Sequence, residues 1–487
     1  MTRENQWFRA ACAAMRRSWP ACTAALLLSA CGTGRAAGGA SANTRPAQPD
    51  IVVILTDDAG YADFGFTGAT DGMTPAIDAL AASGVVCTQA YTTASVCSPS
   101  RAGMLSGRYQ QRVGHEFNAN QLRDDGTGWG FPAGESLLPE LLAPAGYRTV
   151  YLGKWHLGAM PEHHPNANGV DEFTGLIDGS RSYRAMPNAG ALKRLQRNGV
   201  AIDESPEAMS GLYLTDFLSD EAVRALESPR TQPLLLFVSY TAPHTPMHAR
   251  DPALAVRDGD GPAHERRRAV EREMIRAVDE GVARILGAIK PGTLVFLTND
   301  NGGATNNGSD NGALRGMKGS KWEGGIRVPF IARWDGVLEP GTTYAKPISL
   351  MDITATACAA AGAPAAPKEL DGVDLLPFLT GARGDATPHE WLFWRRGVVS
   401  AARHGDWKFI RSAGNPDILV DLASDPGETV NRAGDEPDRA AAMAAALDLW
   451  ERDMVPPGNA EAEVYRRNQI SKHRMETVGR DAERALP

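Results

Sequence analysis

Residues 50–56, DIVVILT, decide the fold of this chain. The run is apolar almost without interruption and rich in β-branched residues, which is typical of a strand buried on both faces of a parallel sheet. Outward from it, segments with a helical spacing of apolar residues alternate with short apolar runs. The predicted helices cover 74–84, 137–142, 218–226 and 270–289, and the predicted strands cover 85–91, 149–152, 234–238 and 293–297. This alternation predicts an α/β domain with a large, mostly parallel sheet flanked by helices.

The composition changes near residue 385, where shorter and more polar strands begin. These strands are predicted at 391–394, 398–402, 407–411 and 418–421, and an Ala-rich helix follows from about Arg439. The pattern favours a smaller antiparallel sheet with a helix against it. Since 487 residues exceed one ordinary hydrophobic core, we expect two domains, at 49–385 and 386–487.

The N-terminal residues carry an export pattern. Arg16 and Arg17 precede an apolar stretch at 21–28 that is too short to span a bilayer, and the stretch leads into Leu-Ser-Ala-Cys ending at Cys31. This resembles a bacterial lipoprotein signal over residues 1–31, with Met15 as an alternative start, although an ordinary cleaved signal peptide has similar features. Residues 32–48 are small and polar and read as a flexible tether. We therefore expect an exported protein that is anchored to the cell envelope, in the periplasm or at the outer membrane, through a lipid on Cys31.

Net charge and cysteine content argue against a nucleic-acid-binding protein and against a disulfide-stabilised fold. The net charge of -8 argues against nucleic acid as an obligate partner, because such a protein needs a basic face for the phosphates. Only Cys87, Cys97 and Cys358 lie beyond the leader, which is too few for a disulfide scaffold.

Polar residues follow four of the predicted strands. They are Asp57 and Asp58, Lys154 to His156, His244, and Asp300 with Asn301. Open α/β sheets bind ligands at the carboxyl ends of their strands, so these groups are expected to meet. Carboxylate and amide oxygens suit Ca²⁺, with Mg²⁺ as a second possibility, and two adjacent carboxylates are costly without a cation. The alternative is that Asp57 and Asp58 only cap the next segment.

A fifth cluster, CSPSRAGMLSG at 97–107, reads as a turn that leads into a helix. Pro99 suits a helix start, and the amide groups of that start would face an anion. Taken alone, Cys97 is as well explained as a buried structural thiol.

The segment at 97–107 resembles the signature of the sulfatase family, in which the cysteine becomes formylglycine (3-oxoalanine). Further segments of the chain are similar to the same family in the same order. They are LTDDAGYADFG at 55–65, GKWHLG at 153–158, SYTAPHTP at 239–246, LTNDNGG at 297–303 and KGSKWEGGIRVP at 318–329. The tail segments RHGDWKFIRS and DLASDPGETVN are similar to the family's smaller C-terminal domain. The resemblance implies an alkaline phosphatase-like fold and the hydrolysis of a sulfate ester.

The resemblance also implies roles for individual residues. The implied metal ligands are Asp57, Asp58, Asp300 and Asn301, together with an oxygen of modified Cys97. The implied catalytic residues are Cys97, Arg101 to steady the hydrated aldehyde, Lys154 and Lys318 to bind sulfate oxygens, His244 to protonate the leaving oxygen, and His156 to deprotonate the hydrate. The implied partners are a sulfated small molecule or glycan and a maturation enzyme that generates formylglycine.

Competing interpretations remain open from the sequence. A phosphonate or phosphate ester hydrolase on the same scaffold is the nearest alternative, and a non-catalytic binding lipoprotein is a distant one. Lys318 lies in a basic run that could be a solvated surface. His163, His164 and His248 read as loop residues, Trp155 and Trp322 as packing residues, and the segment at 115–118 either borders a substrate pocket or is a structural loop.

Overall fold

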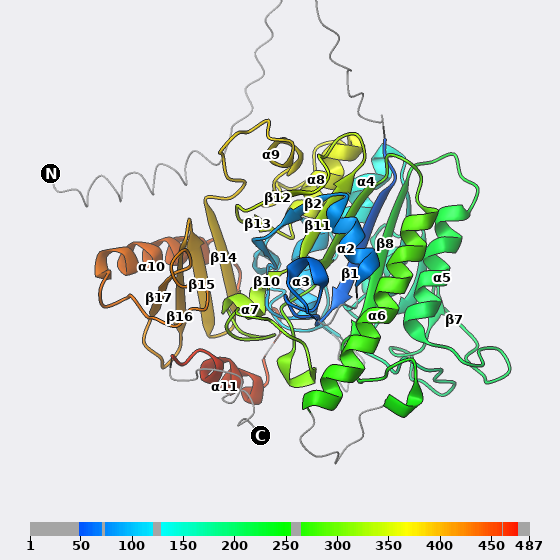
Figure 1. Cartoon of the computed structure of the whole chain (residues 1–487), viewed down its shortest axis with the longest axis horizontal. Coiled ribbons are helices and arrows are strands. Elements are labelled where there is room, and N and C mark those ends of the chain that lie inside the picture. The colour runs from blue at the N-terminus through cyan, green and yellow to red at the C-terminus, as the bar shows by residue number, and fades with distance from the viewer. Residues whose placement is uncertain (1–47, 71–73, 120–127, 255–263, 460, 476–487) are drawn as a thin grey trace, which may run out of the picture.

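The computed structural model describes residues 48–70, 74–119, 128–254, 264–459 and 461–475, and it contains a large sheet beside a small one (Figure 1). The large sheet has ten strands. Their order across the sheet is β12 (Thr342–Tyr344), β2 (Val85–Cys87), β11 (Phe330–Trp334), β9 (Leu294–Asn299), β1 (Ile51–Asp57), β8 (Leu234–Pro243), β4 (Arg148–Lys154), β5 (Glu172–Leu176), β6 (Gln196–Arg197) and β7 (Val200–Ala201). The central strands β9, β1, β8, β4 and β5 are parallel, and β11 runs antiparallel to β9. The prediction of a large, mostly parallel sheet is confirmed.

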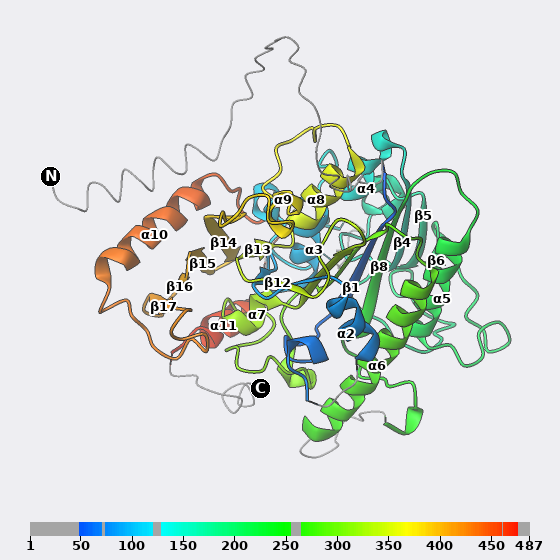
Figure 2. The same cartoon turned by 45° about the horizontal axis from the view of Figure 1, so that its top comes forward.

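Helices cover both faces of this sheet, which explains the unbroken apolar run of β1. Ile51, Val53 and Leu55 face one apolar cluster, whereas Val52 and Ile54 face the other, because successive side chains of a strand point to opposite faces. The first cluster includes residues of α3 (Cys97–Ser106), α4 (Leu138–Leu142) and α8 (Asp352–Ala361). The second includes residues of α2 (Pro75–Ala82), α5 (Leu214–Glu227) and α6 (His264–Ala288), and the last two helices lie side by side in Figures 1 and 2.

One predicted strand is wrong. Residues 85–91 form two strands, β2 and β3 (Ala90–Tyr91), which belong to different sheets. The polar pair Thr88 and Gln89 forms a turn between them. After that turn, β3 joins a three-stranded sheet between β10 (Arg327–Val328) and β13 (Ile348–Ser349).

The small sheet is antiparallel throughout, as predicted. Its order is β14 (Trp391–Arg396), β15 (Val399–His404), β16 (Trp407–Ser412) and β17 (Ile418–Asp421), and α10 (Pro437–Arg452) packs against β15 and β16. An apolar cluster joins this sheet to the larger part, since it contains Tyr91 and Trp322 together with Trp394. The small sheet therefore shares a core with β3 of the three-stranded sheet and with the segment around α7 (Glu323–Ile326).

A last helix, α11 (Glu463–Lys472), returns to the large domain near α7 (Glu323–Ile326) (Figure 2). The Trp322 indole donates to the Lys472 carbonyl at 2.7 Å, and the Lys321 amide donates to His473 Nε2 at 2.8 Å. The sequence pattern predicts no helix or strand beyond residue 456. Its return places C-terminal residues beside the large sheet.

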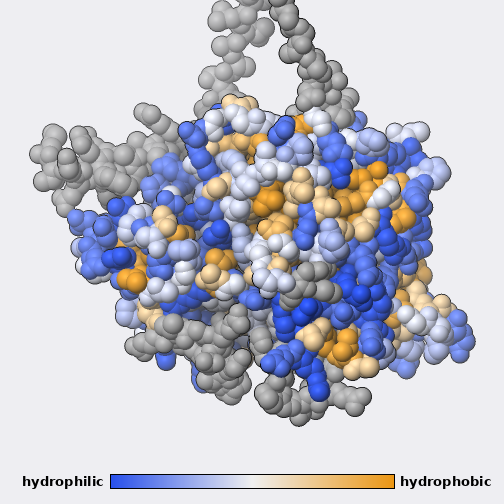
Figure 3. Space-filling view, viewed as in Figure 1, coloured by the Kyte–Doolittle hydropathy of each residue, from blue (hydrophilic) through white to orange (hydrophobic). Residues whose placement is uncertain are grey.

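The described residues contain neither the predicted lipid anchor nor a membrane-spanning helix. Within the described residues, no helix combines the length and apolar character that a bilayer span requires. On the face seen in Figure 3, hydrophobic residues form scattered patches among hydrophilic ones. The predicted leader with Met15 and Cys31, and all of the tether except residue 48, lie outside the described residues.

A buried ion cluster fastens the small sheet to the large domain. Lys408 Nζ, on β16, lies 2.8 Å from Glu323 Oε1 and 2.5 Å from Glu428 Oε1, and all three side chains are fully buried. The Tyr91 hydroxyl donates to the other Glu323 oxygen at 2.6 Å. Removing one partner of such a cluster leaves a buried charge without compensation.

Lys408→Met is therefore expected to lower the free energy of unfolding by about 3–5 kcal/mol. Urea unfolding followed by circular dichroism measures the loss, with Lys290→Met as the matched control because Lys290 is exposed. A Lys408→Met protein as stable as the control would show that the cluster does not fasten the small sheet to the large domain.

Candidate active site

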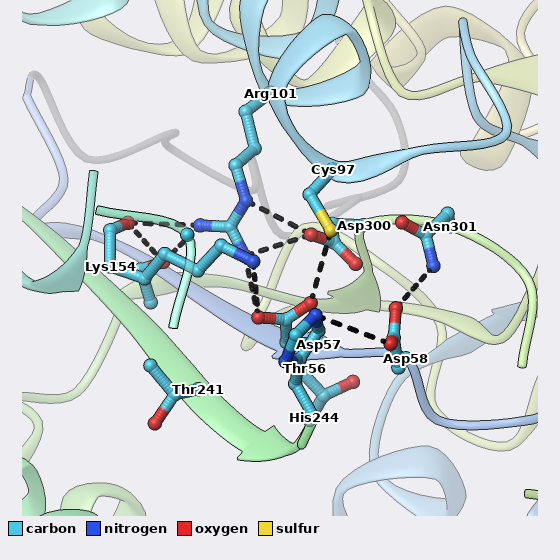
Figure 4. A network of polar contacts seen from close by, with 12 residues as sticks. Thr56, Asp57, Asp58, Cys97, Arg101, Lys154, Thr241, His244, Asp300 and Asn301 are labelled. Carbon is cyan, nitrogen blue, oxygen red and sulfur yellow. Dashed lines mark hydrogen bonds and ion pairs between the residues drawn. The ribbon is translucent and has the colours of Figure 1, made fainter. Parts of the chain in front are cut away.

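The polar residues predicted to meet at the strand ends do so (Figure 4). Asp57 ends β1 and Lys154 ends β4, while His244 directly follows β8. Asp300 and Asn301 come just after β9. Cys97 and Arg101 arrive from the first turns of α3, which Figure 4 shows above the strand ends. The parallel sheet thus brings segments far apart in the sequence to one edge.

A local turn lets Asp57 and Asp58 face the same site. Adjacent residues of a regular strand point to opposite faces, but Asp58 has a φ of +70° and takes the chain out of the strand. Aspartate tolerates this left-handed conformation better than most residues. The Asp58 carbonyl accepts from the Ser309 hydroxyl at 2.7 Å and from the Ala304 amide at 3.2 Å, which fixes the turn.

Each buried carboxylate of the site has a cationic partner. Lys154 Nζ lies 2.6 Å from Asp57 Oδ2, and Lys318 Nζ lies 2.7 Å from Asp58 Oδ1. The Arg101 guanidinium lies 2.9 Å from Asp300 Oδ2. Lys318 is therefore part of the site rather than of a solvated basic surface.

The Cys97 sulfur lies inside this charge array. Lys318 Nζ donates to Cys97 Sγ at 3.3 Å, and Sγ lies 3.5 Å from Asp57 Oδ1. Burial and Asp300 raise the pKa of the thiol, but Lys154 and Lys318 outweigh them and lower it to about 7. The site thus stabilises negative charge on the atom that residue 97 presents.

The donor set fits a divalent cation. Ligand atoms from Asp57, Asp58, Cys97 and His244 lie within 4.8 Å of one another. Within the part of the chain that the structure describes, Oδ1 of Asp300 and Oδ1 of Asn301 are buried without a hydrogen-bond partner. Buried polar atoms are almost always paired, so these two oxygens indicate a missing ligand. Carboxylate and amide oxygens are the ligands that Ca²⁺ and Mg²⁺ prefer.

Arg101 braces the site rather than touching the cysteine sulfur. Its Nε donates to Asp300 Oδ2 at 2.9 Å, and its NH1 donates to the Lys154 carbonyl at 2.9 Å and to Ser239 Oγ at 2.5 Å. The side chain is fully buried. Arg101 therefore fixes Asp300 and the end of β4, and its predicted role toward a hydrated aldehyde stays a prediction.

The two histidines of the site have opposite pKa shifts. Burial, with Lys154 and Arg101, holds the pKa of His156 well below its ordinary value, and neither ring nitrogen has a hydrogen-bond partner among the described residues. Burial and Lys318 lower the pKa of His244, but the nearby aspartates outweigh them and raise it. His244 Nδ1 donates to the Thr245 carbonyl at 2.7 Å, so its Nε2 faces Asp58 at 3.6 Å. A neutral imidazole can accept a proton and a charged one can donate it.

The predicted neighbours of the site separate into lining and supporting residues. Phe117 and Asn118 line a cavity at the site, as the pocket interpretation of 115–118 expected. His115 lies behind it, 2.7 Å from Ser98 Oγ and against the Trp129 ring. Trp155 and Trp322 are buried. His163, His164 and His248 hold no place in the cavity lining.

The cavity has a volume of about 740 Å³ and contains a wall that sequence reasoning missed. On one side it is lined by Asp58, His244 and Lys318. Another part of the lining comes from the end of β14 and from α11 with the residues before it, and includes Arg396, Glu461, Gln469 and Lys472. No motif marked these residues, because only the return of α11 to the large domain brings them to the strand ends.

Comparison with known sequences gives consistent similarities. The family model described as Sulfatase matches residues 49–363. N-acetylgalactosamine-6-sulfatase of Canis lupus familiaris is 33% identical over 404 residues, covering 79% of this chain and 74% of that protein. Arylsulfatase A of Homo sapiens is 32% identical over 439 residues, covering 79% of this chain and 83% of that protein.

Solved structures agree with these sequence similarities. The crystal structure of Ps i-CgsB has a TM-score of 0.75 and 31% identity, covering 84% of this chain and 94% of that one. The structure of Ps i-CgsB in complex with k-i-k-neocarrahexaose has a TM-score of 0.76 and 30% identity, covering 90% of this chain and all of that one.

Asp300→Asn is expected to weaken divalent-cation binding by at least about tenfold, because one ligand oxygen loses its charge. After treatment with a chelator, titration of Ca²⁺ or Mg²⁺ should raise the melting temperature of the wild type, with a much smaller rise for the variant. Asp385→Asn serves as the matched control, since the Asp385 side chain is fully exposed. Equal cation-induced shifts in all three proteins would exclude Asp300 as a ligand.

Proposed function

Because this chain belongs to the sulfatase family and is a sulfuric ester hydrolase, we propose that it cleaves its ester with a formylglycine made from Cys97 and a bound divalent cation. One observation carries the proposal. The Cys97 sulfur lies 3.3 Å from Lys318 Nζ and 3.5 Å from Asp57 Oδ1, within reach of the oxygen ligands described above. A structural thiol has no need of paired lysines and carboxylates around it.

The cation, once bound, would polarise oxygens at residue 97 and on the ester, and the hydrated aldehyde would supply the attacking hydroxyl. Asp57, Asp58, Asp300 and Asn301 would hold the cation, with an oxygen of modified residue 97. Arg101 keeps Asp300 in place through its two contacts to Oδ2. Oxygen ligands of this kind suit both Ca²⁺ and Mg²⁺. The titration described above compares the two ions.

The remaining residues bind the ester and move protons. Lys318 and Lys154 lie where sulfate oxygens at residue 97 would need positive charge. His244 donates a proton to the alcohol oxygen as the sulfur–oxygen bond breaks, and His156 accepts a proton at the nucleophile. In total one water is consumed, the alcohol leaves with the ester oxygen, and sulfate leaves with the oxygen that came from water.

The substrate proposed is a sulfated carbohydrate. The relatives named N-acetylgalactosamine-6-sulfatase and the structure determined with k-i-k-neocarrahexaose support this class. A cavity of about 740 Å³ also has room for a sugar unit next to the reacting group. A maturation enzyme that oxidises Cys97 is the partner that this chemistry requires.

The test is turnover by protein co-expressed with a formylglycine-generating enzyme. A sulfate ester should be hydrolysed faster than the phosphate and phosphonate esters of the same alcohol, and the Cys97 peptide should carry an aldehyde in place of its thiol by mass spectrometry. Cys97→Ala should lower kcat at least about a thousandfold, because the nucleophile is lost. Cys358→Ala is the matched control, since Cys358 lies outside the site.

Three results would contradict this mechanism. Full activity of Cys97→Ala would remove Cys97 from catalysis. Turnover by protein whose Cys97 remains a thiol would show that the aldehyde is not needed for catalysis. Faster hydrolysis of the phosphate or phosphonate ester would assign the other ester class to the site.

We also propose that the chain is exported and held to the bacterial cell envelope by a lipid on Cys31. The support is the sequence alone: two arginines, a short apolar stretch at 21–28, and Leu-Ser-Ala before the cysteine. The tether at 32–48 would leave the folded part clear of the membrane surface.

Cys31→Ser is expected to move the protein from the detergent phase to the aqueous phase in detergent partitioning of bacterial cells, because the lipid anchor is lost. Cys22→Ser, within the apolar stretch, is the matched control and should remain in the detergent phase. Partitioning of both the wild type and the Cys31→Ser protein into the aqueous phase would rule out the anchor.

A further inference from the structure

Three nitrogen donors converge on one small space in the wall of the cavity. The space adjoins Gly319, the residue after Lys318. A side-chain carbon placed on Gly319 would lie 3.4 Å from Gln469 Nε2, 3.4 Å from Lys472 Nζ and 3.6 Å from Arg396 NH1. All four residues line the cavity. We call this space, bounded by Gly319, Arg396, Gln469 and Lys472, the Gly319 niche.

The niche is kept open by the glycine. Gly319 has a φ of +87°, a conformation that side chains rarely adopt, and any side chain would point among the three donors. The Gly319 amide donates to the Ser95 carbonyl at 2.7 Å, which holds the backbone in place. Residue 319 therefore places no side-chain atom among the three donors.

Positive charge exceeds negative charge around the niche. Arg396 is only 8% exposed, its NH2 lies 3.0 Å from Glu461 Oε1, and its Nε has no hydrogen-bond partner among the described residues. Lys321 is buried beside them, and burial together with the charge of Arg396 lowers its pKa to about 7. Glu461 pairs with Arg396, whereas Glu116, the other carboxylate that acts on Lys321, pairs with Arg395. Buried positive charge of this kind is stabilised by an anion.

The niche is coupled directly to the reacting group. Lys472 Nζ donates to the Lys318 carbonyl at 2.8 Å, and the Lys318 side chain donates to Cys97 Sγ. The same cavity is lined by Asp58 and His244. A substrate whose sulfate lies at residue 97 would therefore place its neighbouring groups near Arg396 and Lys472.

We propose that the Gly319 niche is a second anion subsite, which binds another sulfate or a carboxylate of the same substrate. The enzyme then selects glycans with a further anionic group near the scissile sulfate over esters with a single charge. This proposal rests on the proposed function, since the niche acts on the substrate of that same site. Arg396 and Lys472 determine specificity here and do not touch the reacting atoms.

The experiment compares four substrates with the matured full-length enzyme. They are a monosulfated oligosaccharide, the same oligosaccharide with a second sulfate or with a carboxylate, and an uncharged aryl alcohol as its sulfate ester. The readout is the ratio of kcat/KM for each doubly charged substrate to kcat/KM for the aryl sulfate. Because both rates come from one protein preparation, the ratio is insensitive to how much of a variant is folded or matured.

Arg396→Met and Lys472→Met should each lower this ratio about tenfold, mainly through KM, because a charge-assisted contact is lost. Arg396→Lys should lose less than Arg396→Met, and Glu461→Gln should raise the ratio because it removes the competing carboxylate. Arg467→Met is the matched control, since Arg467 is on α11 but its side chain is 77% exposed. Which doubly charged substrate responds more identifies the anion as sulfate or carboxylate.

Two outcomes overturn the proposal in distinguishable ways. A wild-type enzyme that hydrolyses aryl sulfate, with ratios that are unchanged in Arg396→Met and Lys472→Met, shows that the niche does not bind substrate. In that case Arg396 and Glu461 only tie β14 to the C-terminal segment. A wild-type protein that releases sulfate from none of the four esters overturns the proposed function and this subsite with it.

Discussion

The structure depends on the compensation of buried negative charge at the carboxyl ends of β1 and β9. Asp57, Asp58 and Asp300 are withdrawn from water, and carboxylates in such surroundings must be neutralised or paired. Lys154, Lys318 and Arg101 provide this pairing, and each comes from a different part of the chain. Because an unpaired buried charge is strongly destabilising, these distant segments must pack together in one arrangement.

The same constraint explains why the cysteine is unusual. Burial in apolar surroundings ordinarily raises the pKa of a thiol, as it does for Cys87 on β2. Cys97 has its pKa lowered instead, because the lysines that balance the aspartates also face its sulfur. An array that balances carboxylates at rest is also suited to a cation, a sulfate group and the charge that develops during transfer. The Gly319 niche lies next to that array, because Gly319 directly follows Lys318 in the chain.

The sequence predicted what depends on local pattern and strand order. The unbroken apolar run at 51–55 predicted a strand buried on both faces. The polar residues after the parallel strands predicted the cluster at one sheet edge, because the carboxyl ends of parallel strands lie at the same edge. It did not predict the break at Thr88 and Gln89, where two short strands share one apolar stretch but pair in different sheets. It also did not predict the second wall of the cavity. Arg396 and Lys472 sit in segments with no motif, and only tertiary packing of α11 against Trp322 brings them near the site.

The most direct test of this account is a crystal structure of the matured protein grown with Ca²⁺, with the cation located by its anomalous signal. The account predicts one cation bound by oxygens of Asp57, Asp58, Asp300 and Asn301 and by an oxygen on residue 97, at about 2.3–2.6 Å. A cation bound elsewhere, or an unmodified thiol at residue 97 in protein that still hydrolyses sulfate esters, would contradict it.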